Sequence, residues 1–144
     1  MAFNIAWELD EAEGLNTDSL LGKISLNDGT RSLVEDSIYI DSWIGALTEA
    51  SRLAGKGGRR FNIDIVEESR PLRVHRDQAG GLHLLFGQGE VIADSVETFT
   101  GAVRNAASDF VKRATSIEGS GRNSKLDQIR SFVSATSDVS PLHG

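Results

Sequence analysis

The chain has 144 residues, of which 39% are hydrophobic and 25% are charged, and this balance is typical of one soluble globular domain and excludes wholesale disorder. Cysteine is absent, which excludes disulfides, thiol nucleophiles and thiolate metal sites. The net charge of −6 is unevenly distributed, because residues 1–50 carry ten acidic and two basic side chains while residues 51–144 carry eleven acidic and thirteen basic ones. The acidic first part disfavours nucleic-acid binding and favours a basic partner. The alternative interpretation is a solvated acidic face that only keeps the protein soluble.

The first 40 residues are predicted to form three extended segments. Residues 3–9 alternate apolar and polar side chains, which is the pattern of a half-buried strand. A second segment covers residues 21–26 and a less regular third covers residues 32–40. The acidic stretch 10–18 is expected to be a loop, and Asn27-Asp28-Gly29 a tight turn, because glycine accepts a positive φ at little cost.

A helix is predicted to follow at once, over residues 42–54. Asp41 or Ser42 can cap it by accepting a hydrogen bond from an unpaired N–H of the first turn. Trp43 begins a stripe of apolar residues at helical spacing, so it is expected in the core. Gly55 stands where a left-handed residue ends a helix.

The middle of the chain is predicted to form four antiparallel strands that curve around this helix. They are expected over residues 61–66, 72–76, 82–86 and 91–93. Gly80-Gly81 is predicted to be the two-residue turn between the second and third of them. Such a turn pairs Gln78 with His83 or Ala79 with Leu82.

Two further helices complete the expected fold. Asp94-Ser95 resembles the cap of a long amphipathic helix that ends near Ser116, and a short amphipathic helix is expected over residues 124–133. The predicted architecture is an α+β domain over residues 1–118, with a curved antiparallel β-sheet packed against two main helices. Residues 119–144 are expected to form a flexible linker, a short C-terminal helix and a tail.

Side chains that could support chemistry are few. His75 and His83 lie on the two arms of the predicted hairpin, and with Asp77 they could form a metal patch. The two-residue turn does not place the histidines opposite each other, so exposed strand histidines are favoured over a metal site. The acidic cluster of Asp64 and Glu67-Glu68 lacks the two facing carboxylates that a glycosidase needs. With no catalytic or cofactor motif in the sequence, neither an enzyme nor a cofactor is expected.

The start of the first predicted helix carries a loose Tyr-x-x-Ser-Trp-x-x-x-Leu signature, formed by Tyr39, Ser42, Trp43 and Leu47. A β-run precedes it, and a glycine-bearing loop, a strand, an acidic turn, a hairpin and a further strand follow it. This signature and order of elements, over residues 24–114, resemble the small α+β immunity proteins of bacterial contact-dependent growth inhibition and related polymorphic toxin systems. The resemblance implies a protein that binds and neutralises a cognate toxin C-terminal domain, commonly a nuclease.

The resemblance does not carry over any toxin-facing residues, so charge alone indicates them. An acidic surface can bind over the basic cleft of a nuclease and block it, and the opposite charges speed the association of the two proteins. The acids expected to contact the partner are Glu8, Asp10, Glu11, Glu13, Asp18, Asp28, Glu35 and Asp36. Trp7 and Tyr39 adjoin acids and could serve as hot spots, although ordinary sheet packing is slightly favoured.

Two other classes of function stay open. One is an adaptor or assembly subunit that acts through the sheet edge or the C-terminal helix, and the other is a small-molecule-binding or enzymatic domain. No apolar run approaches the length of about 20 residues that crosses a bilayer, and no signal peptide is visible. We therefore expect a cytoplasmic protein with no membrane contact, and its oligomeric state stays open.

Overall fold

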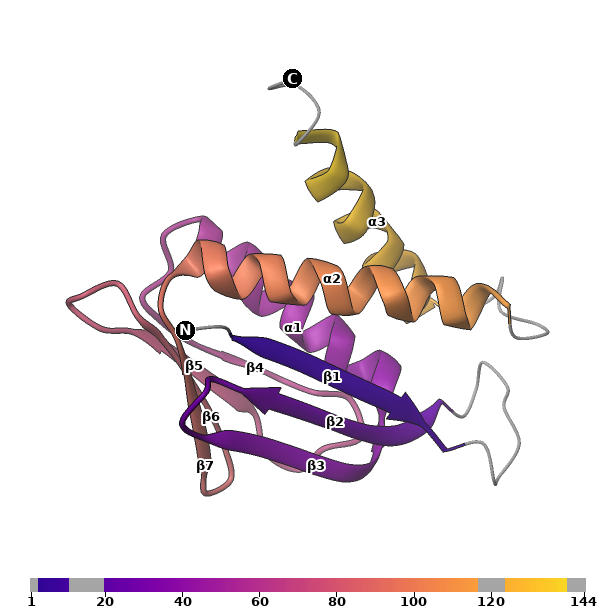
Figure 1. Cartoon of the computed structure of the whole chain (residues 1–144), viewed down its shortest axis with the longest axis horizontal. Helices are drawn as coiled ribbons and strands as arrows, with labels where there is room; N and C mark the ends of the chain where they lie inside the picture. The colour runs from indigo at the N-terminus through magenta and orange to yellow at the C-terminus, as the bar shows by residue number, and fades with distance from the viewer. Residues whose placement is uncertain (1–2, 11–19, 117–123, 140–144) are drawn as a thin grey trace.

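The computed structural model describes residues 3–10, 20–116 and 124–139. Within these residues the chain forms two antiparallel sheets and three helices, and the helices gather on one side of the sheets (Figure 1). The predicted α+β class is confirmed. The strands are divided between a three-stranded and a four-stranded sheet, rather than continuing through one curved sheet.

The first sheet contains β1 (Asn4–Leu9), β2 (Leu21–Asn27) and β3 (Ser32–Tyr39), in that order. Their alternation buries Ile24 and Leu26, as the period of two predicts. At Gly22 the neighbouring strands β1 and β2 come so close that a Cβ would lie 2.0 Å from the carbonyl oxygen of Glu8. Only glycine fits this position without moving β1.

The second sheet contains β4 (Arg60–Ile63), β5 (Leu72–Arg76), β6 (Leu82–Phe86) and β7 (Gly89–Ala93) in chain order. The predicted two-residue turn between β5 and β6 is wrong. Arg76 pairs with Leu82, and the loop covers residues 77–81. The reason is Asp77, whose carboxylate accepts hydrogen bonds from the backbone N–H groups of Ala79 and Gly81 and so holds a wider loop.

The first helix, α1 (Ile40–Gly55), begins earlier than predicted and is capped differently. Its N-cap is Tyr39, which makes no side-chain capping bond, so the predicted caps Asp41 and Ser42 lie in the first turn instead. The strand β3 runs directly into the helix, and the N–H of Ile40, the first helical residue, donates to the carbonyl oxygen of Leu20. At the other end the positive φ, +97°, belongs to Gly57 and not to Gly55.

The second helix, α2 (Val96–Thr115), starts as predicted, because the hydroxyl of Ser95 accepts a hydrogen bond from the N–H of Thr98. The third, α3 (Ser124–Val139), is longer than the predicted segment 124–133. Leu126 and Ile129 are fully buried in the same core as the sheets. The helix α3 therefore packs on α1 and α2 as a part of the main domain.

The core lies between the sheets and the helices, and aromatic side chains link its layers. Trp43 is fully buried, as predicted, and its ring meets Phe86 of β6 edge to face at 4.7 Å. Trp7 packs edge to face on Phe110 of α2 at 5.3 Å, and its Nε1–H donates to the carbonyl oxygen of Ala106. These contacts agree with sheet packing as the main role of Trp7.

Candidate functional site

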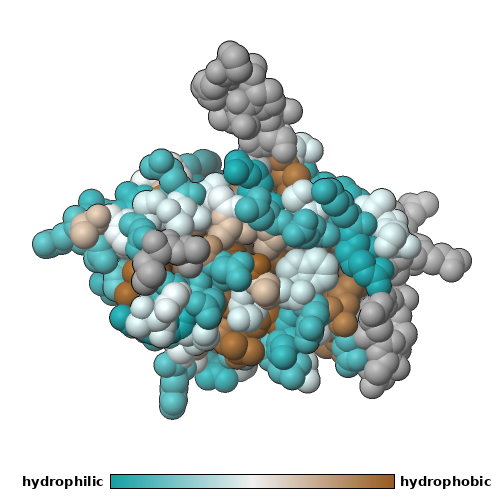
Figure 2. All heavy atoms as spheres, viewed as in Figure 1, coloured by the Kyte–Doolittle hydropathy of each residue, from teal (hydrophilic) through white to brown (hydrophobic). Residues whose placement is uncertain are grey.

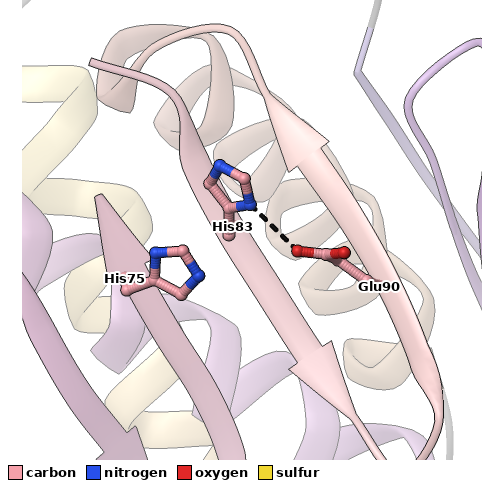
Figure 3. Close-up of side chains that lie close together, drawn as sticks. All are labelled: His75, His83 and Glu90. Atoms are coloured by element: carbon pink, nitrogen blue, oxygen red, sulfur yellow. Dashed lines mark hydrogen bonds and ion pairs between the residues drawn. The ribbon is translucent and has the colours of Figure 1, made fainter. Parts of the chain in front are cut away.

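The outward face of the second sheet carries a group of four interacting side chains, called here the histidine cluster: His75, Asp77, His83 and Glu90. His75 and His83 are directly paired residues on β5 and β6, and Glu90 lies on β7 (Figure 3). The wide loop sets this register. The expectation that His75 and His83 do not lie opposite each other is therefore wrong. Both point away from buried Val74 and Leu84, as the alternation predicts.

His83 is held on both sides by carboxylates. Its Nδ1 lies 2.9 Å from Oε2 of Glu90, and its Nε2 lies 2.8 Å from Oδ2 of Asp77. Burial would lower the pKa of His83, but the hydrogen bonds and charges of Glu90 and Asp77 outweigh this and raise its pKa above the ordinary value. The side chain is 17% exposed, so solvent screens these contacts only in part.

The pKa values of the two carboxylates shift in the opposite direction, to below their ordinary values. The hydrogen bond from His83 lowers the pKa of Glu90, against the effect of burial, and the charges of His83, Arg31 and His75 lower it further. The hydrogen bond from His83 also lowers the pKa of Asp77, together with the backbone N–H of Gly81. Arg31 fixes the second oxygen of Glu90, with 3.1 Å between Nη1 and Oε1.

His75 is held more loosely than its neighbour. Its ring stacks on that of His83, with centroids 4.4 Å apart and planes inclined by 16°. Within the described part of the chain, no hydrogen bond to the His75 ring is found. His75 also lines a hollow of about 450 Å³ over β4, β5 and β6, beside Arg60 and Arg73. The ring can therefore turn without breaking a polar contact.

The sequence contained signals for this cluster that the prediction did not use. Glu90 lies two places beyond the Gly87-Gln88 turn, and this turn pairs Leu85 with Glu90, diagonally next to His83. Asp77 is the first residue of a loop that ends in two glycines, a position where aspartate often bonds the backbone. Both signals depend on turn geometry.

The predicted partner-binding acids are dispersed, and three of them meet at one end of the first sheet. Glu8, Asp10 and Asp36 line a hollow of about 330 Å³, called here the acidic hollow, together with Leu9, Gly22 and Lys23. Lys23 forms an ion pair of 3.6 Å with Glu8, and both side chains are largely exposed. On the face seen in Figure 2, hydrophilic side chains predominate and hydrophobic ones form separate patches.

Two other predicted acids have intramolecular roles. Asp28 is buried, and its carboxylate accepts hydrogen bonds from the N–H groups of Thr30, Arg31 and Ile92. Burial would raise its pKa, but these bonds and the Arg31 charge lower it. Glu35 is partly buried, which raises its pKa, as does the charge of Glu68. Neither lines the acidic hollow.

The remaining predicted acids, Glu11, Glu13 and Asp18, lie outside the described residues. Glu68, in the predicted acidic turn Glu67-Glu68, accepts a hydrogen bond from Nε1 of the buried Trp43 at 3.2 Å. Arg70 in the same loop lies over the ring of Phe86, with its guanidinium carbon 5.3 Å from the centroid. This acidic turn therefore holds the signature tryptophan in place.

The three helices border a hollow of about 500 Å³. Its lining is mostly apolar and includes Thr48, Ser51, Thr100, Phe132 and Ala135. The hydroxyls of Ser51 and Thr100 bond each other across α1 and α2 at 2.7 Å. This hollow is called here the groove between the helices.

Comparison with protein families, with curated proteins and with solved structures gives no match for this chain. Among the described residues, no helix is both long and apolar enough to cross a membrane.

Proposed function

We propose that this chain is a non-enzymatic immunity protein, which binds and neutralises a basic toxin domain through the acidic hollow. The observation that carries the proposal is the convergence of Glu8, Asp10 and Asp36, from the end of β1 and from β3, around a single base, Lys23. These residues are close in space although 26 positions separate Asp10 from Asp36 in sequence. The acidity of residues 1–50 is therefore partly concentrated on one surface.

The electrostatics of such a surface support an inhibitor of a nucleic-acid-cleaving toxin. A nuclease needs a basic cleft for its phosphate substrate, and a hollow with three acids and one base is complementary to it. Opposite charges speed the encounter of two proteins, by about 10- to 1,000-fold when the fields are strong. A fast encounter benefits an inhibitor that must act before its toxin reaches nucleic acid.

The test starts from the gene neighbourhood. A large secreted protein with a variable C-terminal domain, encoded directly beside this chain, supplies the candidate toxin domain. Purified chain is expected to inhibit that domain at a stoichiometric ratio and to protect cells that produce it. The proposal is overturned if no such neighbour exists, or if the neighbour's domain is equally toxic in the presence and absence of the chain.

Charge reversal then locates the surface. Glu8→Lys, Asp10→Lys and Asp36→Lys in one variant are expected to lower the association rate constant at least about 10-fold, because attraction becomes repulsion. The matched control reverses three exposed acids that do not line the hollow, Asp64, Asp94 and Glu97. Both variants change the net charge by the same amount. Equal rates for both variants would exclude the acidic hollow and favour the groove between the helices.

A further inference from the structure

We propose that His75, His83 and Glu90 form a Zn²⁺ site on the outward face of the second sheet, with Asp77 orienting the ring of His83. The three residues come from three adjacent strands, and each can offer one ligand atom, all within 4.8 Å of one another (Figure 3). Two imidazoles and one carboxylate are a ligand set that zinc accepts. This site is separate from the acidic hollow and independent of the proposed inhibitor function.

The surroundings of His83 match those of a zinc-binding histidine. Such a histidine usually donates its other ring N–H to a carboxylate, which fixes the tautomer and the orientation of the ring. Here Nε2 lies 2.8 Å from Oδ2 of Asp77, and the backbone N–H groups of Ala79 and Gly81 hold the same side chain in place. With the proton on Nε2, the lone pair of Nδ1 points towards Glu90 and is available to an ion.

The distances require only a small rearrangement. Bonds of 2.0–2.1 Å in a tetrahedron place ligand atoms about 3.3 Å apart. Nδ1 of His83 and Oε2 of Glu90 are already 2.9 Å apart, and Arg31 holds the other carboxylate oxygen, Oε1, at 3.1 Å. His75 has to turn out of its stack towards the other two ligands. Its ring bears no hydrogen bond within the described residues, so this movement breaks no polar contact.

The site also has room for a fourth ligand. His75 lines the hollow of about 450 Å³ that contains Arg60 and Arg73. Three protein ligands and one open position are typical of zinc sites that bind water or an anion in addition. Arg31 and Arg60 oppose a cation, whereas Asp77 and Glu90 favour it, so the carboxylates and the direct bonds to the ion must exceed this repulsion.

Zinc titration of the full chain tests the site. The chain is freed of metal with EDTA, moved to chelator-free buffer and titrated with Zn²⁺ by calorimetry. We expect one ion per chain with micromolar or tighter affinity, and a rise in Tm on addition of zinc. Replacement of zinc by Co²⁺ should give the visible absorption of a tetrahedral site. A wild-type chain that binds no zinc overturns the proposal.

Variants distinguish this site from adventitious binding. His75→Ala, His83→Ala and Glu90→Gln should each weaken binding at least about 100-fold, whereas Asp77→Asn should weaken it about 10- to 100-fold and keep one ion per chain. His143→Ala is the matched control, because it removes a histidine outside the cluster, and it should bind like the wild type. Zinc affinity that survives both His75→Ala and Glu90→Gln overturns the proposal.

Circular dichroism of the metal-free variants checks that each remains folded. His75 and Glu90 are only partly buried, so these two variants are expected to fold even if His83→Ala does not. The test of the zinc site therefore depends on His75→Ala and Glu90→Gln. Its outcome is independent of whether any toxin domain binds the chain.

Discussion

The carboxylate of Asp28 accepts a hydrogen bond of 2.9 Å from the backbone N–H of Ile92, and this bond joins the two sheets. Asp28 lies in the turn between β2 and β3, whereas Ile92 lies on β7, 64 positions further along the chain. The ion pair of Arg31 with Glu90 connects the same two regions. The β2–β3 turn is therefore a part of the contact between the sheets.

Replacing Asp28 should consequently destabilise the whole domain. Asp28→Ala leaves the N–H groups of Thr30, Arg31 and Ile92 without their acceptor, and we expect a loss of about 3 kcal/mol in the free energy of unfolding. Urea unfolding followed by circular dichroism measures it. The control, Asp64→Ala at an exposed position, should stay within about 0.5 kcal/mol of the wild type. Equal stabilities of the two variants would contradict this role of Asp28.

The histidine cluster predicts a pH dependence of stability without metal. Because the pKa of His83 is raised above 6.5, its contribution is complete below pH 6.5 and is lost as the pH rises through the folded-state pKa. Because the pKa values of Asp77 and Glu90 are lowered from 3.8 and 4.5, their contribution is present above those values and is lost in acid. The cluster should therefore stabilise the fold most between about pH 4.5 and 6.5.

Urea unfolding of wild type and His83→Gln at several pH values, with EDTA present, measures this effect. The difference between the two free energies should be largest near pH 5.5 and should decrease towards pH 8. His143→Gln serves as the control and should follow the wild type throughout. A difference that does not change with pH would show that His83 acts through packing alone.

Two glycines should respond in opposite directions to the same substitution. Gly22→Ala puts a Cβ 2.0 Å from the carbonyl oxygen of Glu8, so β1 must move away and the domain should lose at least about 2 kcal/mol. Gly101 lies inside α2 with nothing within 4 Å of its Cβ position, so Gly101→Ala should gain up to about 1 kcal/mol. Thermal unfolding of both variants checks the pair, and a stable Gly22→Ala chain would contradict the close approach.

The third helix should unfold together with the rest of the domain. Ile129 is fully buried against the common core, so Ile129→Ala should cost about 2–4 kcal/mol, whereas exposed Ser131→Ala should be nearly neutral. Tryptophan fluorescence reports on Trp7 and Trp43 in the main core. If Ile129→Ala left the fluorescence transition unchanged, α3 would be a separately stable appendage.

Local patterns were sufficient to predict much of this fold. The alternation along β1, β2 and β5 to β7, the buried stripe of α2 and the Ser95 cap all follow from nearest-neighbour chemistry, and the structure confirms them. The strand predicted over residues 61–66 is shorter, since β4 ends at Ile63. The start of α1 did not follow, because the helix begins at Ile40 without a capping side chain and the N–H of Ile40 donates to the distant carbonyl oxygen of Leu20. Tertiary contacts decide such boundaries.

The candidate sites were harder to predict, because they depend on register. One side chain, Asp77, widens the β5–β6 loop, and this change brings His75 opposite His83. For the acids, charge alone could not separate Asp28, which is used inside the fold, from Glu8 and Asp36, which line an open hollow. Only the three-dimensional neighbours make this distinction.

The bond from Trp7 to the carbonyl oxygen of Ala106 also bears on how quickly the chain can fold. It joins β1 to α2 across 99 positions of sequence, and the Phe3–Phe99 ring contact at 5.8 Å closes a loop of similar size. Closing such long loops costs entropy before the buried surface can compensate, which slows folding to the range of about milliseconds to seconds. On the ribosome, the first strand emerges long before the helix that covers it, so its apolar side chains stay exposed until α2 has been synthesised.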